Sequence, residues 1–192
     1  MIIGIDLDGV IYNSEFWLQA FTEIFDIENG GNGILEPSEN SISKRYGWDD
    51  EFAKNFRLKY LPVQMKECPI MPYAKETLQK LKDRGHKIMI ITSRGSVDES
   101  HIGITKDRLS KDKIPFDELY FSKENKVNIC KNKRIDIMVD DTPIVIEQLA
   151  KENIKCLYFK NGPTKQIELY NVKTVYNFGD VFRQIYNLEK EI

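Results

Sequence analysis

The sequence contains few of the residues that build disulfide frameworks or zinc sites. Its 192 residues include three cysteines, Cys68, Cys130 and Cys156, and two histidines. The cysteines are widely separated and form no C-x-x-C pair, and the histidines lack metal-ligand spacing. Free thiols in a reducing compartment explain such cysteines better than disulfides or zinc do. We therefore expect a cytoplasmic protein.

Long hydrophobic runs and an excess of one charge are also absent. The apolar runs are far shorter than the roughly 18 residues of a membrane span. Residues 1–6 carry no basic leader, so we expect a strand there rather than a signal peptide. The 28 Lys and Arg residues nearly balance 30 Asp and Glu residues, for a net charge of −2. This balance does not indicate binding to a membrane or a nucleic-acid polymer. A small-molecule partner and self-association into a homo-oligomer both remain possible.

Short apolar segments alternate with helical patterns along most of the chain. Segments rich in Ile and Val and bounded by polar residues fit buried parallel strands. Their alternation with helices favours an α/β fold with a doubly wound parallel sheet and right-handed crossovers. Strands are predicted at residues 2–6, 87–92, 119–121, 135–139 and 154–159, with a short edge strand at 173–176. Helices are predicted at 72–84, 98–113, 123–131 and 143–151, and before a last helix Asp180 is a candidate cap.

One interval interrupts this alternation, because residues 7–71 contain no convincing strand. Residues 13–25 carry aromatic side chains at helical spacing, residues 28–40 are typical of a loop, and residues 48–61 indicate a second helix. We therefore predict a catalytic core formed by residues 1–14 and 72–192, with a small helical cap at 15–71 inserted after the first strand.

Polar side chains follow several predicted strands at the point where each strand ends. In an open α/β sheet, ligands bind beyond the carboxyl ends of the strands. We therefore expect four carboxylates, hydroxyl groups and at least one ammonium at one edge of the sheet. The residues are Asp6 and Asp8 after the first strand, Thr92, Ser93 and Arg94 after the second, Lys123 and Lys126 after the third, and Asp140 and Asp141 after the fourth.

This set of residues suits phosphoryl transfer. Clustered carboxylates repel one another, and a divalent cation neutralises them. Oxygen ligands without Cys or His favour Mg²⁺ over zinc. Asp6 would attack phosphorus and form an aspartyl-phosphate, while Asp8 would protonate the leaving oxygen and then activate water. The hydroxyl of Thr92 and a lysine ammonium would hold the phosphate oxygens.

Four segments resemble the motifs of the haloacid dehalogenase superfamily, in the right order and strand context. They are DLDGV at 6–10, IIT at 90–92, Lys126, and VDD at 139–141. The resemblance spans residues 1–157 and implies metal binding by Asp6, Asp8, Asp140 and Asp141, with phosphate binding by Thr92, Ser93, Arg94 and Lys126. It makes Asp141 the first choice for the direct ligand and Asp140 a ligand through water, although the two could be exchanged. It favours Lys126 over Lys123.

A finer resemblance is to bacterial relatives of the 5′(3′)-deoxyribonucleotidases. It rests on ITSR at 91–94, DDTP at 140–143 and a cap between the first two motifs. It implies hydrolysis of a nucleoside monophosphate or a similar small phosphate ester. A phosphatase for sugar phosphates is an alternative, because the motifs handle only the phosphate. A response-regulator receiver is another, although its phosphorylated residue follows the third strand and it has no such insertion. A catalytically silent binding module is the third.

Several residues also have simpler interpretations. Asp6 and Asp8 could end a strand in a turn, and Asp140 and Asp141 could cap the helix that begins at Pro143. Arg94 is ambiguous between a phosphate contact and a solvent-exposed partner of Asp98 or Glu99. Among the aromatic residues near the first motif, packing is favoured for Trp17, whereas Tyr12 is the better candidate for a substrate contact.

Overall fold

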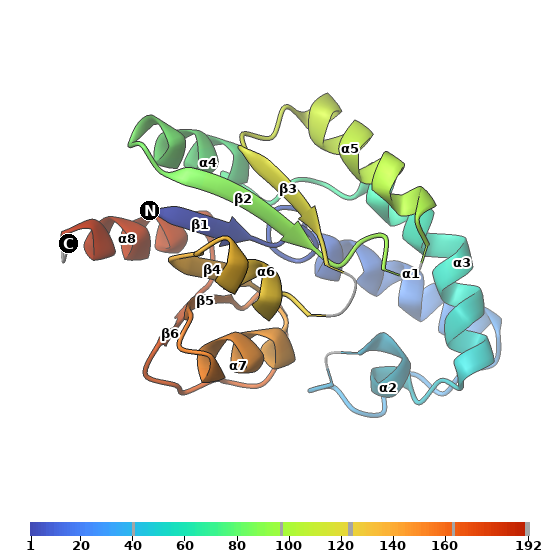
Figure 1. Ribbon diagram of the computed structural model, residues 1–192. Helices are drawn as coiled ribbons and strands as arrows, with labels where there is room; N and C mark the ends of the chain where they lie inside the picture. The colour runs from blue at the N-terminus through green and yellow to red at the C-terminus, as the bar shows by residue number, and fades with distance from the viewer. Residues whose placement is uncertain (40, 97, 123–124, 163, 191–192) are drawn as a thin grey trace.

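A parallel sheet forms the centre of the protein, as predicted (Figure 1). The computed structural model describes residues 1–39, 41–96, 98–122, 125–162 and 164–190. Within these residues the sheet has six strands in the order β3-β2-β1-β4-β5-β6, all parallel. The strands are β1 (Ile2–Ile5), β2 (Lys87–Thr92), β3 (Glu118–Phe121), β4 (Ile137–Asp140), β5 (Lys155–Phe159) and β6 (Val172–Val175).

Helices cover both faces of the sheet, because both faces of its strands are apolar. Successive side chains in a strand point to opposite faces, so Ile88 and Ile90 of β2 join one core layer while Met89 and Ile91 join the other. The first layer is covered by α4 (Ala74–Asp83), α5 (Ser100–Asp112) and α8 (Phe178–Glu189), and the second by α6 (Val127–Asn132) and α7 (Pro143–Lys151). The prediction of a doubly wound α/β sheet is confirmed.

The interval after β1 forms a helical cap region, which lies beside the carboxyl ends of the strands in Figure 1. It contains α1 (Ser14–Glu28), α2 (Ile42–Tyr46) and α3 (Asp50–Glu67). The helices share an aromatic cluster centred on the buried rings of Phe25, Phe56 and Tyr60. The predicted helical cap is confirmed, while its exact limits at residues 15 and 71 stay a prediction.

Two features of the cap region differ from the sequence-based expectation. The short helix α2 was not predicted. Helix α3 continues through Pro62 to Glu67, whereas the predicted helix ended at residue 61. This last turn packs against other parts of the protein, because its residues Gln64 and Met65 are buried. Packing against the rest of the protein thus extends the helix beyond the point where its sequence pattern weakens.

The start of α8 corrects the expectation that Asp180 is the capping residue. Asn177 is the N-cap, and its side-chain oxygen accepts a hydrogen bond from the backbone N–H of Asp180 at 2.9 Å. The carboxylate of Asp180 accepts in turn from the backbone N–H of Tyr176 at 3.1 Å. The side chains of Asn177 and Asp180 therefore each satisfy one backbone N–H group at the start of α8.

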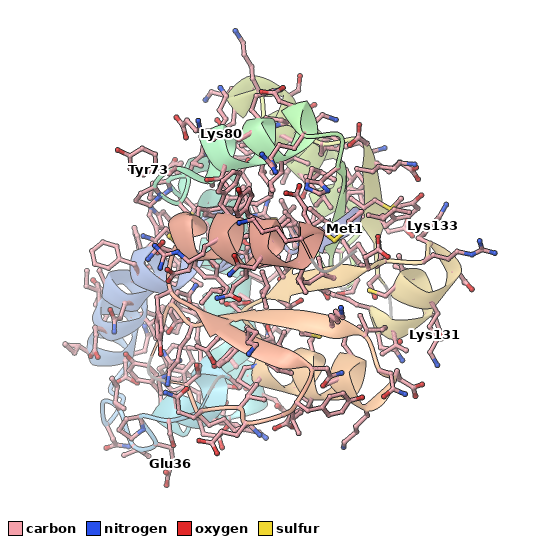
Figure 2. The ribbon with its side chains drawn as sticks, turned by 90° about the vertical axis from the view of Figure 1, so that its left-hand side faces the viewer. Met1, Glu36, Tyr73, Lys80, Lys131 and Lys133 are labelled. Atoms are coloured by element: carbon pink, nitrogen blue, oxygen red, sulfur yellow. The ribbon has the colours of Figure 1, made fainter. Side chains whose placement is uncertain are left out.

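Helix α8 is tied to the start of the chain at the amino ends of the strands. Figure 2, viewed from that side, shows Met1 beside the end of α8. The amino group of Met1 lies 3.3 Å from Nδ1 of His86, and the other ring nitrogen of His86 contacts Glu189. Arg84 donates to the same carboxylate at 3.1 Å. These contacts lie at the opposite end of the strands from the polar residues predicted to form the site.

The state of the cysteines agrees with the expectation of free thiols. All three cysteines are buried free thiols. In the part of the chain that the structure describes, no helix combines the length and apolar character needed to cross a lipid bilayer.

Candidate active site

Segments that follow four strands, β1 to β4, meet at one pocket at the carboxyl edge of the sheet. The sheet order reverses around β1, which lies between β2 and β4, and ligands bind at such a switch point in doubly wound folds. The pocket has a volume of about 400 Å³. Of the predicted site residues it is lined by Asp6, Asp8, Thr92, Ser93, Arg94, Lys126 and Asp141.

Lys126 links the ends of β1 and β4. Its Nζ lies 2.8 Å from Oδ1 of Asp6 and 2.6 Å from Oδ2 of Asp140, and all three side chains are buried. The other oxygen of Asp140 accepts from the backbone N–H of Thr142 at 2.9 Å, at the start of α7. Both oxygens of Asp140 are therefore engaged. Lys123, the rival of Lys126 for phosphate binding, lies outside the described residues.

Three carboxylates lie close enough to share one cation. Asp6, Asp140 and Asp141 each offer an oxygen, and these atoms lie within 4.8 Å of one another. Gly9, whose φ is +76°, allows Asp141 this position, because a Cβ at residue 9 would lie 1.8 Å from Oδ2 of Asp141. A donor set made only of carboxylate oxygens fits Mg²⁺, which prefers hard oxygen ligands.

Burial raises the pKa values of two carboxyl groups at the site. Desolvation raises the pKa of Asp6 to about 7. The positive charge of Lys126 opposes this rise, and the negative charge of Asp140 adds to it. Desolvation, followed by the charges of Asp140 and Asp6, also raises the pKa of Asp141 well above its usual value. Burial disfavours the ammonium of Lys126, but Asp140 and Asp6 outweigh burial and raise its pKa. Among the described residues one ammonium, that of Lys126, contacts these carboxylates, and a divalent cation would offset their remaining charge.

Asp8 has different partners from the other three aspartates. Nε of Arg94 donates to Oδ2 and Nη2 donates to Oδ1, each at 2.7 Å. Nε2 of Gln64 in α3 donates to Oδ1 at 3.1 Å. Among the described residues, the group that could hold a metal does not include Asp8. Both oxygens of Asp8 are bound by Arg94, and its predicted role as a metal ligand stays a prediction.

Arg94 is an interior residue, which corrects one of its two interpretations. Its side chain is 2% exposed and is paired with Asp8, so it is not a solvent-exposed partner of Asp98 or Glu99. Its backbone N–H donates to Oγ1 of Thr92 at 3.2 Å, and both residues line the pocket together with Ser93. Their predicted roles in phosphate binding stay predictions.

Tyr12 does not reach the pocket, which corrects its expected role as a substrate contact. Its side chain is fully buried and its hydroxyl donates to Oδ2 of Asp112 at 2.9 Å. The guanidinium carbons of Arg94 and Arg108 lie 5.2 and 4.9 Å from the centre of its ring. Tyr12 thus packs behind the Asp8–Arg94 pair. Trp17 packs against Phe21, with ring centres 4.2 Å apart, as expected.

The sequence analysis missed Gln64, Ser14 and Glu15. Ser14 and Glu15 line the pocket, and Oε1 of Glu15 accepts from Nη1 of Arg45 at 2.7 Å. Their position at the start of the helix that follows DLDGV was a usable signal, because that turn begins beside the site. A glutamine in a cap helix carries no such signal, so Gln64 could be found only in the folded protein.

Solved structures of other proteins share the fold of this chain. No protein-family model matches the chain. A haloacid dehalogenase-like hydrolase of Streptococcus pneumoniae has a TM-score of 0.66 at 17% identity, over 96% of this chain and 97% of that chain. A D,D-heptose 1,7-bisphosphate phosphatase of B. bronchiseptica, complexed with magnesium and phosphate, has a TM-score of 0.59 at 11% identity, over 97% and 98%. The chain therefore has the fold of these two hydrolases.

Among curated proteins, the chain is similar to a putative nucleotidase of Oceanobacillus iheyensis. The two are 35% identical over 124 residues. The matched region covers 62% of this chain and spans 60% of the length of that relative. The receiver alternative is wrong, because receivers have the strand order 2-1-3-4-5 and this sheet has the order 3-2-1-4-5-6.

Proposed function

We propose that the chain is a Mg²⁺-dependent phosphomonoester hydrolase in which Asp6 is the nucleophile. The observation that carries this proposal is the group formed by Asp6, Asp140 and Asp141, with Lys126 bound between the first two. A strand-end turn or a helix cap does not explain why three carboxylates from two strand ends share so small a volume. Phosphoryl transfer does, because it brings an anionic nucleophile to an anionic substrate.

Each residue has a defined task in the proposed reaction. Lys126, Thr92, Ser93 and Arg94 hold the phosphate oxygens. A bound Mg²⁺ would reduce the repulsion between the Asp6 carboxylate and the phosphate. The carboxylate of Asp6 forms a bond to phosphorus while the bond to the leaving oxygen breaks, and Asp8 gives that oxygen a proton. Asp8 then takes a proton from water, which attacks phosphorus, releases phosphate and restores Asp6.

The contacts favour Asp141 over Asp140 as the direct metal ligand. Both oxygens of Asp140 are engaged, by Lys126 and by the backbone N–H of Thr142. Among the described residues Asp141 accepts one hydrogen bond, from the hydroxyl of Thr142 at 3.2 Å, and it lines the pocket. Asp140 is better placed to orient Lys126 or to act through water.

We infer that the substrate is a nucleoside monophosphate, which is supported by the name of the similar Oceanobacillus protein. One observation favours the second candidate, a sugar phosphate. In the described part of the chain no Phe, Tyr or Trp side chain lines the pocket, whereas Ser14, Glu15 and Ser96 do. Such polar groups suit the hydroxyls of a sugar better than they suit a stacked base.

A phosphatase screen tests the proposed function and separates the two substrate classes. Nucleoside monophosphates, deoxynucleoside monophosphates and sugar phosphates are compared at equal concentration with Mg²⁺, by release of inorganic phosphate. EDTA should inactivate the enzyme reversibly, and added Mg²⁺ should restore turnover. A strong preference for deoxynucleotides supports the nucleotidase, and a preference for sugar phosphates supports the alternative. Absence of turnover on all of them contradicts the proposal.

Replacement of Asp8 by alanine should reduce kcat by about 10²-fold or more on alkyl phosphate esters, because proton transfer to the leaving oxygen is lost. The measurement is steady-state phosphate release from a nucleoside or sugar phosphate. Thermal unfolding should be measured alongside, because the substitution leaves the buried guanidinium of Arg94 without its carboxylate partner. An unchanged rate with a poor leaving group would exclude Asp8 as the acid and base.

A further inference from the structure

Two side chains from different parts of the fold hold the carboxylate of Asp8. Arg94 follows β2 and belongs to the core, and it binds both oxygens of Asp8 in the plane of its guanidinium group. Gln64 belongs to α3 of the cap region and donates to Oδ1 of Asp8. A bidentate arginine fixes the plane of a carboxylate, and the third donor adds a contact from the cap side.

The core half of this arrangement is rigidly supported. The guanidinium of Arg94 lies over the buried ring of Tyr12, whose hydroxyl is fixed by Asp112. Arg108 bonds the same carboxylate of Asp112, and it also donates to the backbone oxygen of Cys68 at 2.7 Å, just beyond the end of α3. The position of Arg94 is therefore set by packing that does not involve Gln64, so removal of Gln64 need not displace Arg94.

Gln64 is an unexpected residue for its surroundings. It is 3% exposed, on a helix that otherwise buries Met65, Tyr60 and Phe56. Its Oε1 is buried and has no hydrogen-bond partner among the described atoms. A half-satisfied buried amide is less favourable than an apolar side chain of the same size. Packing therefore does not explain glutamine at this position, whereas the hydrogen bond from Nε2 to Asp8 does.

We propose that Gln64 is a positioning residue that orients Asp8 for proton transfer to the leaving oxygen. This inference rests on the proposed function, in which Asp8 is the general acid and base. Arg94 holds the Asp8 carboxylate from the core side, and Gln64 is the donor that reaches it from the cap side. Gln64 fixes Oδ1 relative to the cap, so the orientation of the acid depends on where α3 lies. The cap region thereby contributes to the chemistry as well as to the walls of the pocket.

The role of an acid can be separated from a structural role by the choice of leaving group. An alkoxide is a poor leaving group and needs a proton, whereas nitrophenolate leaves without one. Loss of Gln64 should therefore slow hydrolysis of an alkyl phosphate and leave hydrolysis of p-nitrophenyl phosphate nearly unchanged. A general disturbance of the pocket would slow both reactions to the same extent.

The experiment measures kcat and KM with Mg²⁺ for Gln64→Met on glycerol phosphate and on p-nitrophenyl phosphate. Methionine keeps the length and burial of glutamine but cannot donate. We expect kcat on glycerol phosphate to fall about tenfold, a part of the roughly 10²-fold that proton transfer supplies, with KM changed less than about twofold. On p-nitrophenyl phosphate we expect a change of less than about twofold.

A matched control removes another polar group from the same helix. Tyr60 lies one turn before Gln64 and is packed against Phe25 and Phe56. Tyr60→Phe should leave the ratio of the two rates unchanged. Gln64→Glu replaces the hydrogen-bond donor by an acceptor and should show the same selective loss on glycerol phosphate. It replaces Gln64→Met in the experiment if the methionine variant does not fold. Both are checked by thermal unfolding.

The possible results separate this inference from the proposed function. Equal losses on both esters, or no loss on either, in a folded Gln64 variant would overturn the positioning role. A wild-type chain that hydrolyses none of the phosphate esters, including the nucleotides and sugar phosphates of the substrate screen, would overturn the proposed function and the inference with it. A wild-type chain that hydrolyses both, together with a selective loss in the variants, supports both.

Discussion

Replacement of Asp6 by asparagine is expected to reduce turnover of every phosphate ester by about 10⁴-fold or more, because an amide oxygen does not replace the carboxylate as a nucleophile. The loss should appear in kcat and should be independent of the leaving group. This independence distinguishes Asp6 from Asp8, whose loss should matter most for poor leaving groups. Steady-state phosphate release and a single-turnover test for phosphoenzyme check the result. Turnover close to that of the unmodified chain would remove Asp6 from the mechanism.

The same variant should remain folded, and the pKa of Asp6 gives the direction of the change in stability. Because this pKa is raised to about 7, the protonated side chain stabilises the metal-free protein at low pH. That contribution is lost as the pH rises from the usual carboxyl range through 7. Asparagine is neutral at every pH. Without metal, Asp6→Asn should therefore unfold at the same or a higher temperature than the unmodified chain at pH 8, and a much lower temperature there would contradict this account.

Replacement of Lys126 by methionine should lower the free energy of unfolding by about 3–5 kcal/mol, the usual effect of breaking a buried ion pair from one side. Lys126 is the cation between Asp6 and Asp140, and the side chain of Asp140 has no exposed surface. Without the ammonium, Asp140 would stay in the interior with the hydrogen bond from Thr142. Urea denaturation without metal measures the change, and turnover should fall as well.

Lys131 provides a matched control for Lys126, because it is also ion-paired and lies in α6, the helix that begins directly after Lys126. Lys131 of α6 projects from the surface in Figure 2, and its ion pair with Glu152 is about half exposed on both sides. Lys131→Met should change the free energy of unfolding by less than about 1 kcal/mol, because exposed ion pairs contribute little. A loss of under about 1 kcal/mol for Lys126→Met as well would show that Asp140 does not depend on its buried partner.

The sequence was sufficient for the part of the site that follows from strand periodicity. Asp6, Thr92 and Asp140 each end an apolar run, and parallel strands bring their carboxyl ends to one edge of the sheet. The edge therefore follows from the alternation of strands and helices before any contact is known. The start of α7 at Pro143 was predictable for a similar reason, because proline fits the first turn of a helix.

Side-chain partners at the same edge were not predictable in this way. The sequence left Arg94 between two interpretations, and only the fold shows that its partner is Asp8. Tyr12 stands four residues after Asp8, yet the turn at Gly9 directs it into the core rather than toward the pocket. Nearness in the sequence to a motif does not determine on which side of a turn a side chain lies.

By itself, the sequence determined the α/β class, the six strands and the set of carboxylates available at one edge of the sheet. These depend on local hydrophobic periodicity and on where each apolar run ends. Only the tertiary structure decided that Lys126 lies between Asp6 and Asp140, that Asp141 faces Gly9, and that Gln64 of the cap region binds Asp8. Such contacts join residues far apart in the chain, and their geometry depends on how whole helices pack against the sheet, which no local pattern encodes.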